Sequence, residues 1–134
     1  VYKRQLVRAA VEEADHLDWC KRRLVELGAR PSKFNPIWIS GSCLMGIVLG
    51  AVGDSASLGF VEETERQVVD HLNSHLLRLP ESDLRSHSII SVMLEDEEKH
   101  ATRAKANGGR RPPKIFRRVM MLQARVMTTL SYKL

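Results

Sequence analysis

The sequence has 134 residues, a mass of 15.2 kDa and a formal net charge of +5, with 43% hydrophobic and only 5% aromatic residues. A chain of this length predicts one domain with its own core. Two cysteines, Cys20 and Cys43, are too few for a disulfide framework, which indicates free thiols in a reducing compartment. No apolar segment follows the charged first residues, so no signal peptide is predicted.

The charge is divided unevenly along the chain. Residues 1–98 carry eleven Lys and Arg against sixteen Asp and Glu, whereas residues 99–134 carry ten Lys and Arg and no acid. Such a basic tail either binds an anionic partner or serves as a solubilising surface. Because aromatic residues do not alternate with the basic ones, we favour a membrane surface over nucleic acid.

Sparse Gly and Pro and short β-branched runs predict an all-α chain. Gly28 is placed to end the first helix, Pro36 to begin the second, and Ser82 or Asp83 to cap the fourth. The predicted helices span residues 3–27, 36–53, 56–79, 83–106 and 113–132. The last is amphipathic and basic, which suits either packing with a solvated face or contact with a membrane.

The second predicted helix has an unusual composition. Residues 37–53 contain no charge, and Ser42, Gly46 and Gly50 form a stripe of small residues at four-residue spacing. Such a stripe permits close approach of another helix. We interpret residues 36–53 as a membrane-contact helix that packs by its small face and dips an apolar face into one leaflet. The alternative is a buried core helix.

Two Glu-x-x-His pairs interrupt apolar helical stripes. They are Glu13 with His16 in the first predicted helix and Glu97 with His100 in the fourth. Residues three positions apart share one face of a helix, so each pair can direct an oxygen and a nitrogen to a common centre. One such pair is weak evidence, but the two share an inward placement.

The third predicted helix offers one more inward carboxylate. Its apolar stripe selects Glu65, with Glu62 and Glu63 to the sides. His71 and His75 lie on the flanks of the stripe. Either could donate to a buried carboxylate, although a surface position is the default for His75.

Carboxylates in an apolar bundle must be neutral, paired with cations or bound to a metal. Oxygen and imidazole ligands suit iron or manganese. Ferritin-like di-metal bundles use one glutamate from each of two helices and a Glu-x-x-His pair from each of the other two. In that arrangement Glu13 and Glu97 would bridge two ions, His16 and His100 would each cap one, and Glu65 would be a terminal ligand. Two iron ions with open coordination positions can activate dioxygen.

Several stretches together resemble one family, the demethoxyubiquinone hydroxylases of ubiquinone biosynthesis, which are membrane-bound di-iron monooxygenases of the Coq-seven type. The matching stretches are residues 12–20, 35–38, 59–61, 64–68, 96–101 and 126–134. They cover nearly the whole chain in family order. The family begins with a further helix that supplies another glutamate, and no residues here correspond to it. The expected fold is therefore a ferritin-like four-helix bundle in a single domain, residues 1–134, with an extra apolar helix, a C-terminal helix and no first bundle helix.

The resemblance implies hydroxylation of the ring of a demethoxyubiquinone-type polyprenyl benzoquinone. The implied cofactors are two iron ions, with electrons from NAD(P)H directly or through a reductase or a quinone. Carried onto matching positions, the iron ligands are Glu13, His16, Glu65, Glu97 and His100, and His71 matches a histidine that holds a ligand in place.

The same resemblance implies a peripheral membrane protein. The expected location is the cytoplasmic face of a bacterial inner membrane or the matrix side of the mitochondrial inner membrane. Expected partners are the quinone, dioxygen, lipid, and either a ubiquinone-biosynthesis complex or further copies of the chain, but not nucleic acid. Two alternatives stay open: an accessory membrane-surface protein with structural carboxylates, and another ferritin-like iron protein. The apolar helix argues against an iron store.

Overall fold

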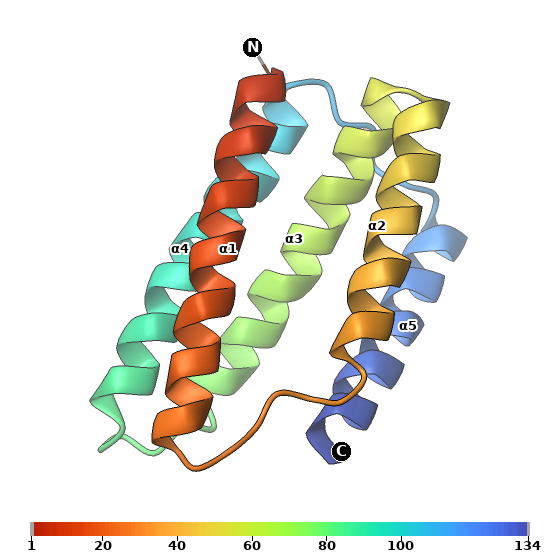
Figure 1. The fold of residues 1–134 in the computed structure, drawn as a ribbon. Helices are drawn as coiled ribbons and strands as arrows, with labels where there is room; N and C mark the ends of the chain where they lie inside the picture. Colours follow the sequence, from red (N-terminus) through yellow and green to blue (C-terminus); the bar gives the residue numbers. More distant parts are fainter. Residues whose placement is uncertain (1, 134) are drawn as a thin grey trace.

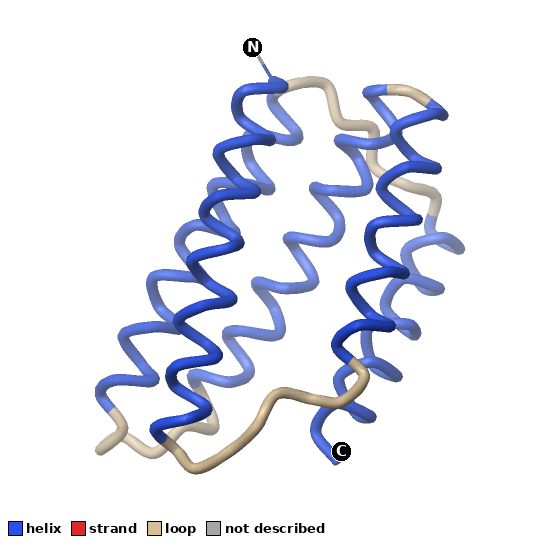
Figure 2. The backbone as a smooth tube through the Cα atoms, viewed as in Figure 1, coloured by secondary structure: helices blue, strands red, loops and turns tan. Residues whose placement is uncertain are grey.

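The computed structural model describes residues 2–133, which form five helices and no strand (Figure 1, Figure 2). The predicted all-α class is therefore confirmed. The helices are α1 (Tyr2–Glu26), α2 (Asn35–Val52), α3 (Asp54–Leu76), α4 (Leu84–Ala106) and α5 (Lys114–Lys133).

The helix ends follow local capping chemistry. Gly28 has a φ of 70°, its N–H donates to the Val25 carbonyl, and the N–H of Ala29 donates to the Leu24 carbonyl. This is the Schellman arrangement, in which glycine takes the left-handed conformation. At the start of α4 the Asp83 carboxylate accepts a hydrogen bond from the Ser86 N–H at 3.0 Å. Each capping signal lies within a few residues of the helix end that it sets, so most predicted boundaries are close to the observed ones.

The third helix differs most from its predicted range. It begins at Asp54 rather than residue 56 and ends at Leu76 rather than residue 79. The N–H groups of Arg78 and Leu79 both donate to the His75 carbonyl, which closes the helix in a tight turn. Leu79 precedes Pro80, and the residue before a proline is disfavoured in a helical conformation.

The packing is centred on α3 and α4, which share the most extensive interface. The most deeply buried apolar side chains, Leu58, Leu72, Ala101 and Ala104, all belong to this pair. Helix α1 packs mainly on α4, while α2 and α5 pack on α3 (Figure 1). The bundle core is therefore built from α1, α3 and α4, and α2 lies outside it.

Helix α2 is apolar but unburied. It is long and apolar enough to cross a membrane, with a mean hydropathy of 1.5, and none of its residues is buried. The alternative of a buried core helix is thus wrong. The expected packing by the small face is also wrong, because a Cβ added at Gly46 or Gly50 would meet no atom within 4 Å. The half-buried residues of α2 are instead larger ones such as Trp38, Met45 and Leu49, which bury more apolar area.

The linker between α4 and α5 crosses α3 at Gly59. A Cβ at this position would overlap the carbonyl group of Arg110. The Arg110 N–H donates to the Ser55 carbonyl at 3.0 Å, and the Ser55 hydroxyl donates to the Gly108 carbonyl at 2.9 Å. The absence of a side chain at Gly59 lets the two backbones approach and fixes where α5 begins.

Candidate metal centre

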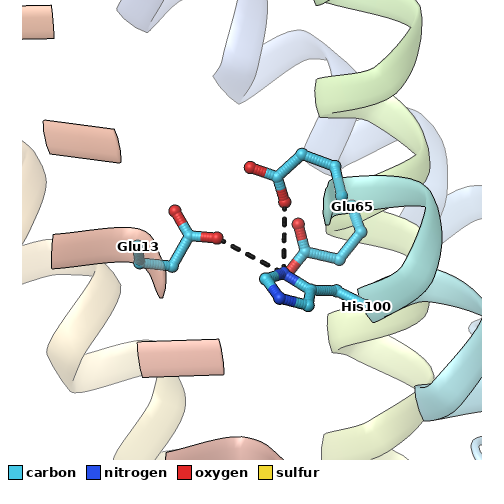
Figure 3. Close-up of side chains that lie close together, drawn as sticks. Glu13, Glu65 and His100 are labelled. Atoms are coloured by element: carbon cyan, nitrogen blue, oxygen red, sulfur yellow. Dashed lines mark ion pairs between the residues drawn. The ribbon is translucent and has the colours of Figure 1, made fainter. Parts of the chain in front are cut away.

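Three helices bring acidic and histidine side chains together in the bundle. Ligand atoms of Glu13 on α1, Glu65 on α3, and Glu97 and His100 on α4 all lie within 4.8 Å of one another. Figure 3 shows Glu13 reaching from α1 toward His100 and Glu65. The structure thus brings together four of the five residues predicted as iron ligands, and we call this group the carboxylate cluster.

His16 adjoins the carboxylate cluster. Its Nδ1 atom lies 3.5 Å from Oε1 of Glu97 and 3.7 Å from Oε2 of Glu13. On the other side, Nδ1 of His100 lies 3.5 Å from Oε2 of Glu97 and 3.5 Å from Oε1 of Glu13. The two imidazoles therefore face the same pair of carboxylates.

The outer nitrogens of the two histidines bond to acids on the opposite helix. His100 Nε2 donates to Oε2 of Glu12 on α1 at 2.7 Å, and His16 Nε2 donates to Oδ2 of Asp96 on α4 at 3.2 Å. An ionised carboxylate only accepts hydrogen bonds, so both protons belong on Nε2. Both Nδ1 atoms are then lone-pair donors that face the cluster.

The inward atoms have no hydrogen-bond partner. His16 Nδ1, His100 Nδ1 and Glu97 Oε2 are all buried without one among the described residues. Buried polar groups are rarely left unpaired, because each unmade bond costs about 1–3 kcal/mol. The free atoms are nitrogen and oxygen donors that converge on one place, so this donor set fits a metal ion.

The carboxylates of the cluster have raised pKa values. Burial, followed by the hydrogen bond and negative charge of Glu65, raises the pKa of Glu97 to about 8. Burial raises the pKa of Glu65 as well, and burial followed by the charge of Glu97 raises that of Glu13. Crowded carboxylates without a cation resist ionisation, and a bound metal ion would reverse this.

Glu13 is less enclosed than the other members of the cluster. Its side chain is 47% exposed, whereas those of Glu97 and His100 are 3% and 2% exposed. The reason is that α1 packs mainly on α4, so the side of Glu13 away from α4 stays open.

The neighbours of Glu65 differ from the expectation that they lie merely to the sides of the stripe. Glu62 and Glu63 are both buried. Glu62 pairs with Arg66 at 3.0 Å, and Glu63 pairs with Arg111 at 3.3 Å. Burial alone therefore does not distinguish Glu65 from these two, but position does, since only Glu65 joins the cluster.

The structure does not bring His71 to the cluster. Its side chain is exposed, and its Nε2 atom lies 2.9 Å from Nε2 of His75, one turn further along α3. Its role in holding a ligand stays a prediction.

Glu12 and Asp96 are the residues that sequence reasoning missed. Each directly precedes the glutamate of a Glu-x-x-His pair, so both helices carry an acid-Glu-x-x-His pattern. This repeated acid was the available signal. Carboxylates that bond to the far nitrogen of a ligand histidine fix its tautomer and orientation.

A helical bundle with two inward Glu-x-x-His pairs and a further glutamate defines a ferritin-like bundle with a cluster compatible with metal binding. The chain matches the family described as ubiquinone biosynthesis protein COQ7 over residues 2–131. It belongs to this family.

Three relatives carry the same name. Proteins called 3-demethoxyubiquinol 3-hydroxylase from Francisella tularensis subsp. tularensis (strain SCHU S4 / Schu 4) and subsp. mediasiatica (strain FSC147) are each 52% identical over 131 residues. The protein of that name from subsp. novicida (strain U112) is 51% identical over 131 residues. Each match covers 98% of this chain and 62% of the relative's length. No solved structure matches the chain significantly.

Proposed function

We propose that this chain forms the metal-holding part of a dioxygen-dependent monooxygenase that hydroxylates the ring of a demethoxyubiquinone-type polyprenyl benzoquinone. The observation that carries the proposal is the set of buried, unpaired inward atoms of His16, His100 and Glu97. It is supported by membership of the ubiquinone biosynthesis family and by relatives named 3-demethoxyubiquinol 3-hydroxylase.

The residues that would hold two iron ions are Glu13, His16, Glu65, Glu97 and His100. Bound iron supplies the activation of dioxygen for insertion of one oxygen atom into the ring. The chain itself supplies a rigid donor set: α3 and α4 bury Glu97 and His100, and the bonds to Glu12 and Asp96 turn both Nδ1 atoms inward. Because Glu13 is half exposed, its side of the cluster is the one that substrate can approach.

The electrons come from NAD(P)H, directly or through a reductase or a quinone. A monooxygenase needs two electrons for each oxygen atom that it inserts, and the Glu and His side chains of the cluster supply none. The partners of this reaction are therefore the polyprenyl quinone, dioxygen and an electron donor, together with a ubiquinone-biosynthesis complex or further copies of the chain.

The substrate's isoprenoid tail resides in lipid, which requires the enzyme to reach a membrane. We assign this contact to α2, whose apolar side chains are largely exposed, including Leu44 at 63%, Ile47 at 71% and Val48 at 50%. Exposed apolar area of this extent on one helix suits burial in an interface. The protein would lie on the cytoplasmic face of a bacterial inner membrane or on the matrix side of the mitochondrial inner membrane.

The direct test is conversion of substrate. The purified protein is loaded with ferrous iron and given a short-tailed demethoxyubiquinone, dioxygen and NADH, and the quinone is analysed by mass spectrometry. We expect a product heavier by one oxygen atom with the unaltered protein and none with Glu97→Ala. A protein that binds iron but leaves the quinone unchanged would contradict the hydroxylase proposal but not the proposal of a metal centre.

A further inference from the structure

A second site is indicated where the linker meets α5, away from the carboxylate cluster. A cavity of about 500 Å³ lies between the end of α2, the start of α3, the linker and the start of α5. We call it the linker cavity; in Figure 1 these segments meet at the upper right. Its lining joins two kinds of surface, an apolar wall and a basic rim.

The apolar wall continues the exposed surface of α2. Leu49 and Val52 from α2, Phe60 from α3 and Phe116 from α5 all line the cavity. Because no residue of α2 is fully buried, the cavity opens beside the surface to which we assign membrane contact. A ligand with apolar chains could therefore contact α2 and the cavity wall at the same time.

The rim is basic. Residues 110–118 contain five basic side chains, which are Arg110, Arg111, Lys114, Arg117 and Arg118. Arg110 and Arg111 line the cavity. Against them stand the lining residue Asp54 and Glu63, which pairs with Arg111 at 3.3 Å and with Arg117 at 3.9 Å. Among the charged residues that line the cavity, Arg110 and Arg111 stand against Asp54 alone, so its lining carries one positive charge in excess.

Arg110 is the cation available to a ligand. It is exposed, and no carboxylate among residues 3–132 forms an ion pair with it. Its backbone is held by the Ser55 carbonyl and by contact with Gly59, and Pro112 and Pro113 stiffen the chain beyond it. The backbone from which the Arg110 side chain extends therefore loses little conformational freedom when a ligand binds. The first turn of α3, which has no side-chain cap, also lines the cavity, and the positive end of the helix dipole favours an anion there.

We propose that the linker cavity binds the phosphate of an anionic phospholipid, with Arg110 as its main contact and the acyl chains lying against α2. The apolar wall favours a lipid over nucleic acid or free phosphate, because neither of these has apolar chains to bury. The inference rests on the membrane-contact part of the proposed function and is independent of the hydroxylation.

The test compares vesicles of phosphatidylcholine alone with vesicles that also contain phosphatidylglycerol, in a co-sedimentation assay with the full chain. Arg110→Gln removes the proposed contact, and Arg110→Lys keeps its charge. Arg85→Gln is the control, because it removes the same charge from a side chain that is 68% exposed at the start of α4, where Arg85 pairs with Glu26 at 2.8 Å. We expect Arg110→Gln to weaken binding to the anionic vesicles about fivefold, the effect typical of one basic residue at an anionic surface. Arg110→Lys and Arg85→Gln should change it less than twofold, and circular dichroism should show equal helix content.

The other outcomes separate the two proposals. Equal losses for Arg110→Gln and Arg85→Gln would overturn the inference in favour of diffuse attraction. Equal binding of the unaltered protein to both kinds of vesicle would also overturn the lipid-site inference, but it would support membrane contact. Binding to neither would overturn both membrane contact and the lipid site but not the metal centre. Duplex DNA could also displace the protein from anionic vesicles. If the protein bound this DNA more tightly than the vesicles, and Arg110→Gln abolished the binding, nucleic acid would be the partner.

Discussion

The Nε2 atom of His100 lies 2.7 Å from Oε2 of Glu12, although the two residues are 88 positions apart. The contact has a counterpart in His16 and Asp96, 80 positions apart, at 3.2 Å. Each acid comes from the helix opposite its histidine, so α1 and α4 orient each other's imidazoles. This reciprocal pairing turns both Nδ1 atoms toward Glu13 and Glu97.

Removal of the outer acids should therefore weaken metal binding without touching a ligand. We expect Glu12→Ala and Asp96→Ala each to lower the affinity for ferrous iron by about 10- to 100-fold, because the histidine loses its fixed tautomer. Anaerobic iron titration measures this. Glu95→Gln is the control, since Glu95 is 69% exposed and pairs with Lys99 on its own helix. Unchanged affinity in both alanine variants would show that the outer bonds do not prepare the site.

The raised pKa of Glu97 predicts a pH-dependent stability of the metal-free protein. The folded chain keeps a proton on Glu97 up to about pH 8, whereas the unfolded chain loses it near pH 4.5. The unfolded state thus binds fewer protons in this window, and the free energy of unfolding should fall as pH rises from 4.5 to 8. Denaturant unfolding at several pH values measures this slope.

Glu97→Gln provides the control for that slope. Its uncharged amide cannot titrate, so the decline should become shallower, although Glu13 and Glu65 still contribute with the same sign. Iron added at pH 7 to the unaltered protein should release protons, because a ligand carboxylate must be ionised. A slope that is the same in both proteins would argue against a buried, protonated Glu97.

The crossing of the linker over α3 makes Gly59 intolerant of a side chain. Gly59→Ala would place a methyl group on the Arg110 carbonyl, and we expect a loss of about 1–3 kcal/mol in the free energy of unfolding. Gly46→Ala is the matched control, because open space surrounds Gly46 and alanine favours the helix by about 1 kcal/mol. Chemical denaturation of both variants measures the difference. If Gly59→Ala is as stable as the unaltered chain, the linker does not lie on α3.

The exposed face of α2 should control membrane binding. Leu44→Asp combined with Val48→Asp places two charges on this face, each of which costs about 3 kcal/mol in the bilayer core. We expect vesicle binding to fall more than tenfold in a flotation assay. Val25→Asp is the control, because Val25 is 72% exposed on α1. If the double variant still binds vesicles normally, α5 becomes the better candidate for the membrane anchor.

Much of this arrangement could be predicted from local patterns. Helix ends at Gly28 and Asp83 depend on residues within one turn, and the apolar stripes select Glu65 and Glu97 by periodicity alone. The pairing of Glu12 with His100 could not be predicted in this way, because it depends on how α1 crosses α4. Periodicity also cannot show what covers the flank of a helix.

Glu63 and His71 illustrate that second limit. Glu63 lies to the side of the apolar stripe, but residues far along the chain, Arg111 and Arg117, come to pair with it there. His71 lies on a flank too, but its side chain is exposed and turns toward His75. The two positions look alike in the sequence and differ only in tertiary packing.

The most direct test of the central claim is the iron content of the purified chain and of its Glu97→Ala variant, measured after anaerobic loading with ferrous iron and removal of the unbound metal. The carboxylate cluster predicts tightly held iron in the unaltered chain and its loss in the variant, with helix content preserved in both. Equal iron in the two proteins, or none in either, would contradict the claim that the inward carboxylates and histidines form a metal centre.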